Sequence, residues 1–141
     1  MTHLLHRMLG VVAMSFELPT WAWPVTLLLS GFALWSAWFL FKNHRLRSAR
    51  SLLATSLIAF IGFPAYAVAY WAERPGTTPE TQELPTNILG VLWWGYVLLV
   101  VFLIVFSKGR RIPMAGLGSL FLWLNFAVFF VCIMAVSGVW L

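Results

Sequence analysis

Residues 88–107 read ILGVLWWGYVLLVVFLIVFS, a run without any charged or histidine side chain. Fourteen of these twenty residues are Leu, Ile, Val or Phe, and on the membrane-insertion scale they contribute roughly −4 to −8 kcal/mol. A hydrocarbon core about 30 Å thick needs about 20 apolar residues in a helix. The stretch is therefore predicted to cross a membrane as an α-helix.

Three other stretches are long and apolar enough to do the same: 22–41, 51–72 and 114–141. The whole chain of 141 residues is 62% hydrophobic and only 9% charged, whereas soluble domains carry about 25% charged residues. This composition excludes a soluble enzyme, a nucleic-acid reader and a secreted disulfide scaffold. We expect an all-α integral membrane protein with four transmembrane helices over residues 21–141.

The ends of these stretches carry helix signals. Ser48 or Ser51 is expected to cap the second helix, and Thr86 or Asn87 the third. Pro113 disfavours a helical residue ahead of it, so the fourth helix is expected to begin after the proline. The segment between the second and third helices, 73–87, is polar and proline-rich and is expected to be irregular.

Basic residues set the orientation. The loop between helices one and two and the loop between helices three and four carry seven of the nine Lys and Arg residues: Lys42, Arg45, Arg47, Arg50, Lys108, Arg110 and Arg111. The other side has two basic residues, Arg7 and Arg74, and all four acids. Basic loops stay on the cytoplasmic side, so both termini are expected outside, with a bacterial inner membrane as the location.

The first 20 residues form a separate segment. One face of a helix there would carry apolar side chains at helical spacing: Leu5, Met8, Leu9, Val12 and Phe16. His3, His6 and Arg7 would lie on the other face. This pattern predicts a short amphipathic helix on the outer membrane surface.

Chemically reactive groups are scarce. Transport and proton pumping rely on charged or histidine side chains at membrane depth, and no Asp, Glu, Lys, Arg or His lies inside the four stretches. The single cysteine, Cys132, lies in an apolar run, and His3 with His6 supplies only two possible metal ligands. We therefore expect no metal site, no catalytic residues and no intrinsic cofactor.

Small residues at helical spacing predict helix packing. In lipid, helices associate through such faces and through interhelical hydrogen bonds. We expect the first and second helices to pack together through two stripes, and Asn125 to bond to a neighbouring helix. The stripes are Ser30, Ala33 and Ala37 on the first helix, and Gly62, Ala65, Ala69 and Ala72 on the second.

Aromatic residues make up 17% of the chain. An aromatic belt at the membrane interface accounts for many of them, but some lie deeper and would suit flat walls for a bound quinone, pigment or lipid. The candidates for such contact are Tyr66, Tyr70, Trp71, Trp93, Trp94 and Tyr96.

Three functions fit these features. The first is a non-catalytic integral subunit or accessory protein that packs in and stabilises a larger membrane complex, in particular an energy-transducing one, respiratory or photosynthetic. Its partners would be membrane lipids and other integral membrane subunits. The alternative is a small self-assembling channel or a pore-blocking protein of the immunity type. A third is a lipid or quinone enzyme that uses the outer-loop acids Glu73, Glu80 and Glu83.

Overall fold

The computed structural model describes residues 2–42, 46–71 and 75–138, and every regular element in these ranges is an α-helix. Four of the helices are long and apolar enough to cross a membrane. The chain is therefore an integral membrane protein with four spans and an additional N-terminal helix, as predicted. The helices are α1 (Thr2–Ser15), α2 (Glu17–Trp21), α3 (Trp23–Lys42), α4 (Leu46–Ala69), α5 (Pro79–Phe106) and α6 (Arg111–Ser137).

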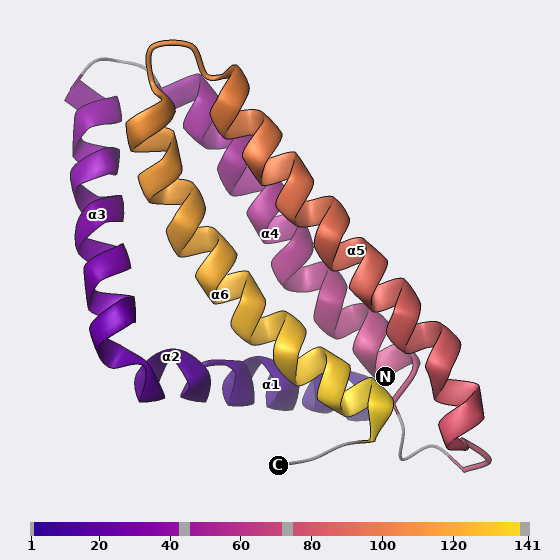
Figure 1. The fold of residues 1–141 in the computed structure, drawn as a ribbon. Coiled ribbons are helices and arrows are strands. Elements are labelled where there is room, and N and C mark those ends of the chain that lie inside the picture. Colours follow the sequence, from indigo (N-terminus) through magenta and orange to yellow (C-terminus); the bar gives the residue numbers. More distant parts are fainter. Residues whose placement is uncertain (1, 43–45, 72–74, 139–141) are drawn as a thin grey trace.

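Helix α6 is the centre of the bundle. It packs against α3, α4 and α5 about equally, whereas α3 and α4 barely touch each other. Figure 1 shows α4, α5 and α6 running side by side, with α3 diverging from them toward the end where α1 and α2 lie. The last spanning helix of the chain therefore holds the three earlier ones together.

Two glycines allow these close approaches to α6. A Cβ atom at Gly116 would collide with Oγ of Ser36 and lie 3.2 Å from the Phe32 ring, both on α3. A Cβ atom at Gly118 would lie 2.8 Å from Cδ1 of Ile104 on α5. Residues two apart on a helix are about 200° apart around its axis. Consequently each glycine faces a different neighbour.

The predicted pairing of the first two spans is therefore wrong. Gly62, Ala65 and Ala69 are exposed on the outside of α4, and Ala72 lies outside the described residues. On α3, Ala33 is buried, Ser30 is half-buried and Ala37 is exposed. This stripe lies near the α6 contact, because α3 packs on α6 instead of α4.

Helix α5 begins nine residues earlier than predicted, at Pro79. Thr78 caps it, since the Thr78 side chain accepts from the backbone N–H of Thr81, and Thr81 Oγ1 accepts from the backbone N–H of Thr78 at 2.7 Å. Proline suits the first helical position, where its missing N–H is not needed. Thr86, an expected cap, lies within the helix and donates to the carbonyl of Gln82 at 2.7 Å. Much of the expected irregular loop is thus helical.

The other boundaries differ less. Helix α4 begins at Leu46, so Ser51 is not its cap. Helix α6 begins at Arg111, which places Pro113 in its first turn, where a missing N–H costs little. It ends at Ser137, because Gly138 adopts a left-handed conformation with a φ of 71°. The remainder of the predicted fourth span, 139–141, lies outside the described residues.

The N-terminal helix lies across the end of the bundle opposite the basic loops (Figure 1). Helix α1 packs on α4 and α6, and its Val11 and Ser15 are buried. Leu5 and Leu9, from the predicted apolar face, are exposed. The guanidinium of Arg7 lies 5.4 Å from the ring centroid of Trp71 just past the end of α4. The predicted face is thus largely available to lipid, and a second face contacts the bundle.

Candidate functional site

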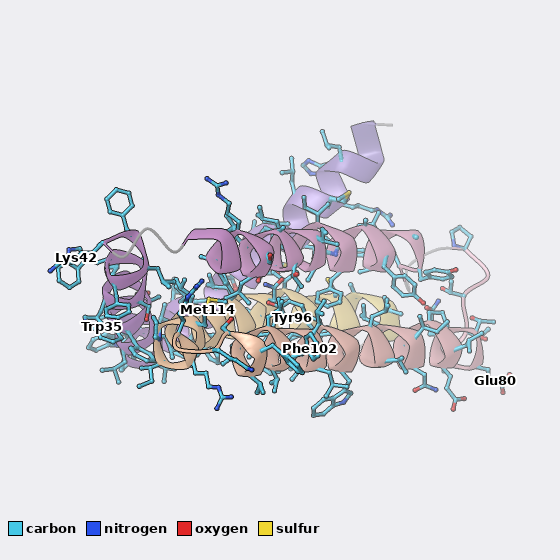
Figure 2. The ribbon with its side chains drawn as sticks, turned by 90° about the horizontal axis from the view of Figure 1, so that it is seen from above. Trp35, Lys42, Glu80, Tyr96, Phe102 and Met114 are labelled. Atoms are coloured by element: carbon cyan, nitrogen blue, oxygen red, sulfur yellow. The ribbon has the colours of Figure 1, made fainter. Side chains whose placement is uncertain are left out.

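Three polar side chains meet in the middle of the bundle, one from each of α4, α5 and α6. Asn125 Nδ2 donates to the hydroxyl of Tyr96 at 3.1 Å, and this hydroxyl lies 3.2 Å from Oγ of Ser56. The exposed fractions are 2% for Asn125, 6% for Tyr96 and 3% for Ser56. Figure 2 shows Tyr96 midway along the bundle. The expected bond from Asn125 to another helix is confirmed, and we call Ser56, Tyr96 and Asn125 the polar triad.

The polar triad joins neutral groups only. A phenol hydroxyl can accept from the amide of Asn125 and donate to Ser56 at the same time. Asn125 Nδ2 also donates to the carbonyl of Phe121 at 3.0 Å, whereas its Oδ1 is buried and has no hydrogen-bond partner among the described residues. A buried polar network specifies how its elements fit together. Accordingly, the triad defines the register of three helices.

Aromatic rings surround the polar triad. Trp93 stacks on Phe129 with a centroid distance of 4.9 Å and an interplanar angle of 15°. Phe63 lies 6.1 to 6.3 Å from Phe129, Trp93 and Tyr96, measured between ring centroids. These rings come from α4, α5 and α6, and they pack on one another. Trp93 and Tyr96 thus belong to the core of the three-helix unit.

The six aromatic residues proposed to contact a quinone, pigment or lipid do not form one pocket. Tyr66 and Tyr70 pair at 4.8 Å between centroids near the end of α4, and Trp71 lies beneath Arg7. Trp94 is 65% exposed on the outside of α5, away from the half-buried Trp93 and the buried Tyr96. The structure divides the set into a core pair, an end cluster and one surface ring.

The end cluster ties three helix ends together. Tyr66 donates its hydroxyl to the carbonyl of Pro85 at 3.2 Å. The buried side-chain amide of Gln82 faces the carbonyls of Tyr70 and Val136, and with its nitrogen turned toward them it donates to both, at 3.0 and 2.9 Å. Gln82 is not among the residues predicted from sequence, because its segment was expected to be irregular. The signal was present in Thr78 and Pro79, a capping residue followed by a first-turn proline.

The outside of α4 presents small and branched apolar side chains to the surroundings. Five exposed residues fall within a sector of roughly 100° on this helix, and we call them the α4 outer face: Ile58, Ile61, Gly62, Ala65 and Ala69. A Cβ atom at Gly62 would have no atom within 4 Å. No other helix of the described chain covers this face.

The basic residues gather at one end. Lys42, Arg50, Lys108 and Arg111 are exposed at the ends of α3 and α5 and the starts of α4 and α6, and we call this the basic end. Arg110 is half-buried there, Arg47 belongs to the first turn of α4, and Arg45 lies outside the described residues. Figure 2 shows Lys42 and Glu80 at opposite ends of the molecule. Within the described ranges, no three His, Cys, Asp or Glu side chains gather as metal ligands.

Comparison with known proteins gives no relative. No family model matches the chain, and no curated protein or solved structure shows significant similarity to it. The polar triad, the α4 outer face and the basic end are therefore the features from which a function is inferred.

Proposed function

We propose that this protein is a non-catalytic integral subunit or accessory protein, which packs into a larger membrane complex and stabilises it. The observation that carries the proposal is the α4 outer face. Lipid tails are as apolar as leucine, so helices in a membrane associate through close packing of small residues. Gly62, Ala65 and Ala69 offer such a surface on the outside of the bundle, where a helix of another subunit can approach.

The distribution of charge supports this role. Asp, Glu, Lys, Arg and His side chains occur only within the end turns of the four spanning helices, and the middle of each span has none of them. The polar triad at mid-membrane is neutral and engaged within the bundle. Transporters and pumps place charged groups at this depth. The interior of this chain is better suited to rigid packing than to moving charge.

We further propose that the complex is energy-transducing, respiratory or photosynthetic. Exposed aromatic side chains such as Trp94 would border lipid, quinone or pigment in such an assembly. The proposed orientation places the basic end in the cytoplasm and both termini outside, in a bacterial inner membrane, because basic loops are retained inside.

Gentle extraction of the tagged chain tests the proposal. In a native gel, we expect the wild-type chain to migrate with larger partners, whose identity would show whether the complex transduces energy. Gly62→Leu should release it as a free chain, because leucine prevents close approach to the α4 outer face. Gly95→Leu is the matched control, since Gly95 is exposed on α5 and its Cβ position is equally open. A wild-type chain that migrates alone would contradict the proposal.

A channel is the alternative function, and it makes a different prediction. Asn125 is the polar residue most suited to line a pore, but it is buried and bonded to Tyr96 of the same chain, which supports packing. The purified protein should therefore produce no selective ion flux in liposomes. Flux that Asn125→Leu abolishes would favour the channel.

The orientation is tested by labelling intact cells with a membrane-impermeant maleimide. In a Cys132→Ala background, Glu80→Cys should react and Lys108→Cys should not, because these exposed residues lie at opposite ends of the chain. The reverse pattern would invert the proposed topology.

A further inference from the structure

A groove opens at the basic end, between α3 and the turn that joins α5 to α6. Its volume is about 680 Å³, and it is lined by Trp35 and Phe39 of α3 on one side and by residues 108–113 on the other. Figure 2 shows Trp35 beside the start of α6. The groove is separate from the polar triad and from the α4 outer face.

One wall of the groove is aromatic. Trp35 and Phe39 stack with a centroid distance of 5.8 Å and an interplanar angle of 27°. At 1.5 Å per residue, Trp35 lies about 10 Å along the helix from Lys42, where α3 ends. This wall thus extends from the membrane surface into the outermost layer of the hydrocarbon. The glycerol and the first acyl carbons of a phospholipid lie at this depth.

The opposite rim is cationic. Lys108, Arg110 and Arg111 fall within four residues, and the tight turn that joins α5 to α6 brings them to this rim. The backbone N–H of Arg110 donates to the carbonyl of Ser107 at 3.0 Å, and Gly109 adopts a φ of 72°, which favours glycine. Nε of Arg111 donates to the carbonyl of Val105 at 3.1 Å, which holds this side chain against the end of α5.

All charged side chains that line the groove have the same sign. No carboxylate is among its lining residues, and the described acids Glu17, Glu80 and Glu83 belong to α2 and to the start of α5, at the other end of the bundle. Basic pockets between membrane helices recognise anionic lipid headgroups, and arginine pairs well with phosphate. Charge and depth together specify an anionic, amphipathic ligand.

We propose that this groove binds one anionic phospholipid. The phosphate contacts the rim formed by Lys108, Arg110 and Arg111. The acyl-chain carbons nearest the headgroup lie on Trp35 and Phe39. The inference goes beyond the proposed function, since the bound lipid requires no partner subunit and the α4 outer face is not involved.

Native mass spectrometry of the purified full-length chain tests the headgroup half of this site. Phosphatidylglycerol and phosphatidylcholine with the same acyl chains are offered in turn. We expect one phosphatidylglycerol to be retained per chain, at least fivefold more than phosphatidylcholine. The double variant Lys108→Gln/Arg111→Gln should lose this preference, and Lys42→Gln/Arg50→Gln should keep it, because the control removes two charges at the same end but outside the groove.

Equal losses in the two double variants would overturn the proposal, since general attraction to the basic end would then suffice. Equal retention of the two lipids would also overturn it. Displacement of phosphatidylglycerol by millimolar inorganic phosphate would show a site for free anions instead of lipid.

The acyl half of the site has its own readout. Phosphatidylglycerol with brominated acyl chains quenches tryptophan fluorescence on contact. Wild-type protein should lose a larger fraction of its fluorescence than Trp35→Phe at the same lipid ratio, and phosphatidylcholine with the same brominated chains should give a smaller difference. The same fractional loss in wild type and variant would show that lipid does not contact Trp35.

Discussion

The unit formed by α4, α5 and α6 and the helix α3 are held in the bundle by different means. The three-helix unit has an interior of its own, with the polar triad at its centre and stacked aromatic rings around it. Helix α3 has only one side against α6, where Ser36 meets Gly116, and a hydrogen bond of 3.0 Å from Trp123 Nε1 to Thr26 Oγ1. Much of its remaining surface is exposed.

The difference shows which interactions determine how helices associate in a membrane. Apolar side chains gain little by leaving lipid for a protein interior, so shape and polar bonds determine which helices associate. The three-helix unit uses both of these at its centre. Helix α3 depends mainly on shape at one glycine, and its polar bond to α6 comes from its first turns, near the membrane surface. Variants of the two regions should therefore differ in effect.

The largest effect is expected at Gly116. Gly116→Ala places a Cβ atom against Ser36, which is fully buried and donates to the carbonyl of Phe32 at 2.7 Å. Overpacking of this kind costs about 1–3 kcal/mol. The free energy of unfolding, measured by SDS titration in mixed micelles, should fall by this amount relative to Gly95→Ala, which faces open space.

A double variant sharpens this test. Ser36→Ala removes the Oγ atom that the new Cβ would meet, so Gly116→Ala should cost less in the Ser36→Ala background. If the cost is the same in both backgrounds, the contact between α3 and α6 is not the cause.

A smaller effect is expected from Tyr96→Phe. The variant keeps the ring but removes the hydroxyl that joins Asn125 to Ser56. Interhelical hydrogen bonds in membranes average about 0.6 kcal/mol each, so losing two should cost about 1 kcal/mol in the same SDS titration. Tyr70→Phe is the control, because Tyr70 is exposed near the end of α4. Equal effects of the two variants would mean that the triad contributes no more than a surface hydroxyl.

The same contrast explains what could be predicted from sequence. Hydropathy and length located four spans, and the pattern of residues 1–20 predicted the N-terminal helix, because burial in lipid depends on each segment by itself. Asn125 was predicted to bond across helices because hydrocarbon offers an amide few other partners. Each of these predictions needs only the residues of one segment.

Pairing between helices was not predictable in this way. The stripe of Gly62, Ala65 and Ala69 has the same spacing whether a helix covers it or not. A Cβ atom at Gly116 or Gly118 would meet a neighbouring helix, yet a separation of two residues places these glycines on different faces, so they form no stripe. The groove at Trp35 was missed for the same reason, since it needs α3 to lie beside the start of α6. These features depend on which helices pack together. Apolar residues do not determine this, because they are equally stable against lipid and against another helix.

The smallest effect is expected from Thr26→Val, which repeats the hydroxyl deletion of Tyr96→Phe in the other region. Thr26 Oγ1 accepts from Trp123, and its hydroxyl hydrogen is shared between the carbonyls of Pro19 at 2.8 Å and Ala22 at 3.2 Å. One accepted and one donated interaction are therefore lost here as well. Thr26 lies in the first turns of α3, close to the membrane surface, where water and lipid headgroups can replace both partners. Valine also keeps the shape. The free energy of unfolding should fall by only about 0.5 kcal/mol or less. A loss equal to that of Tyr96→Phe would mean that depth in the membrane does not distinguish the two regions, and that α3 is held by its polar bonds as firmly as the three-helix unit.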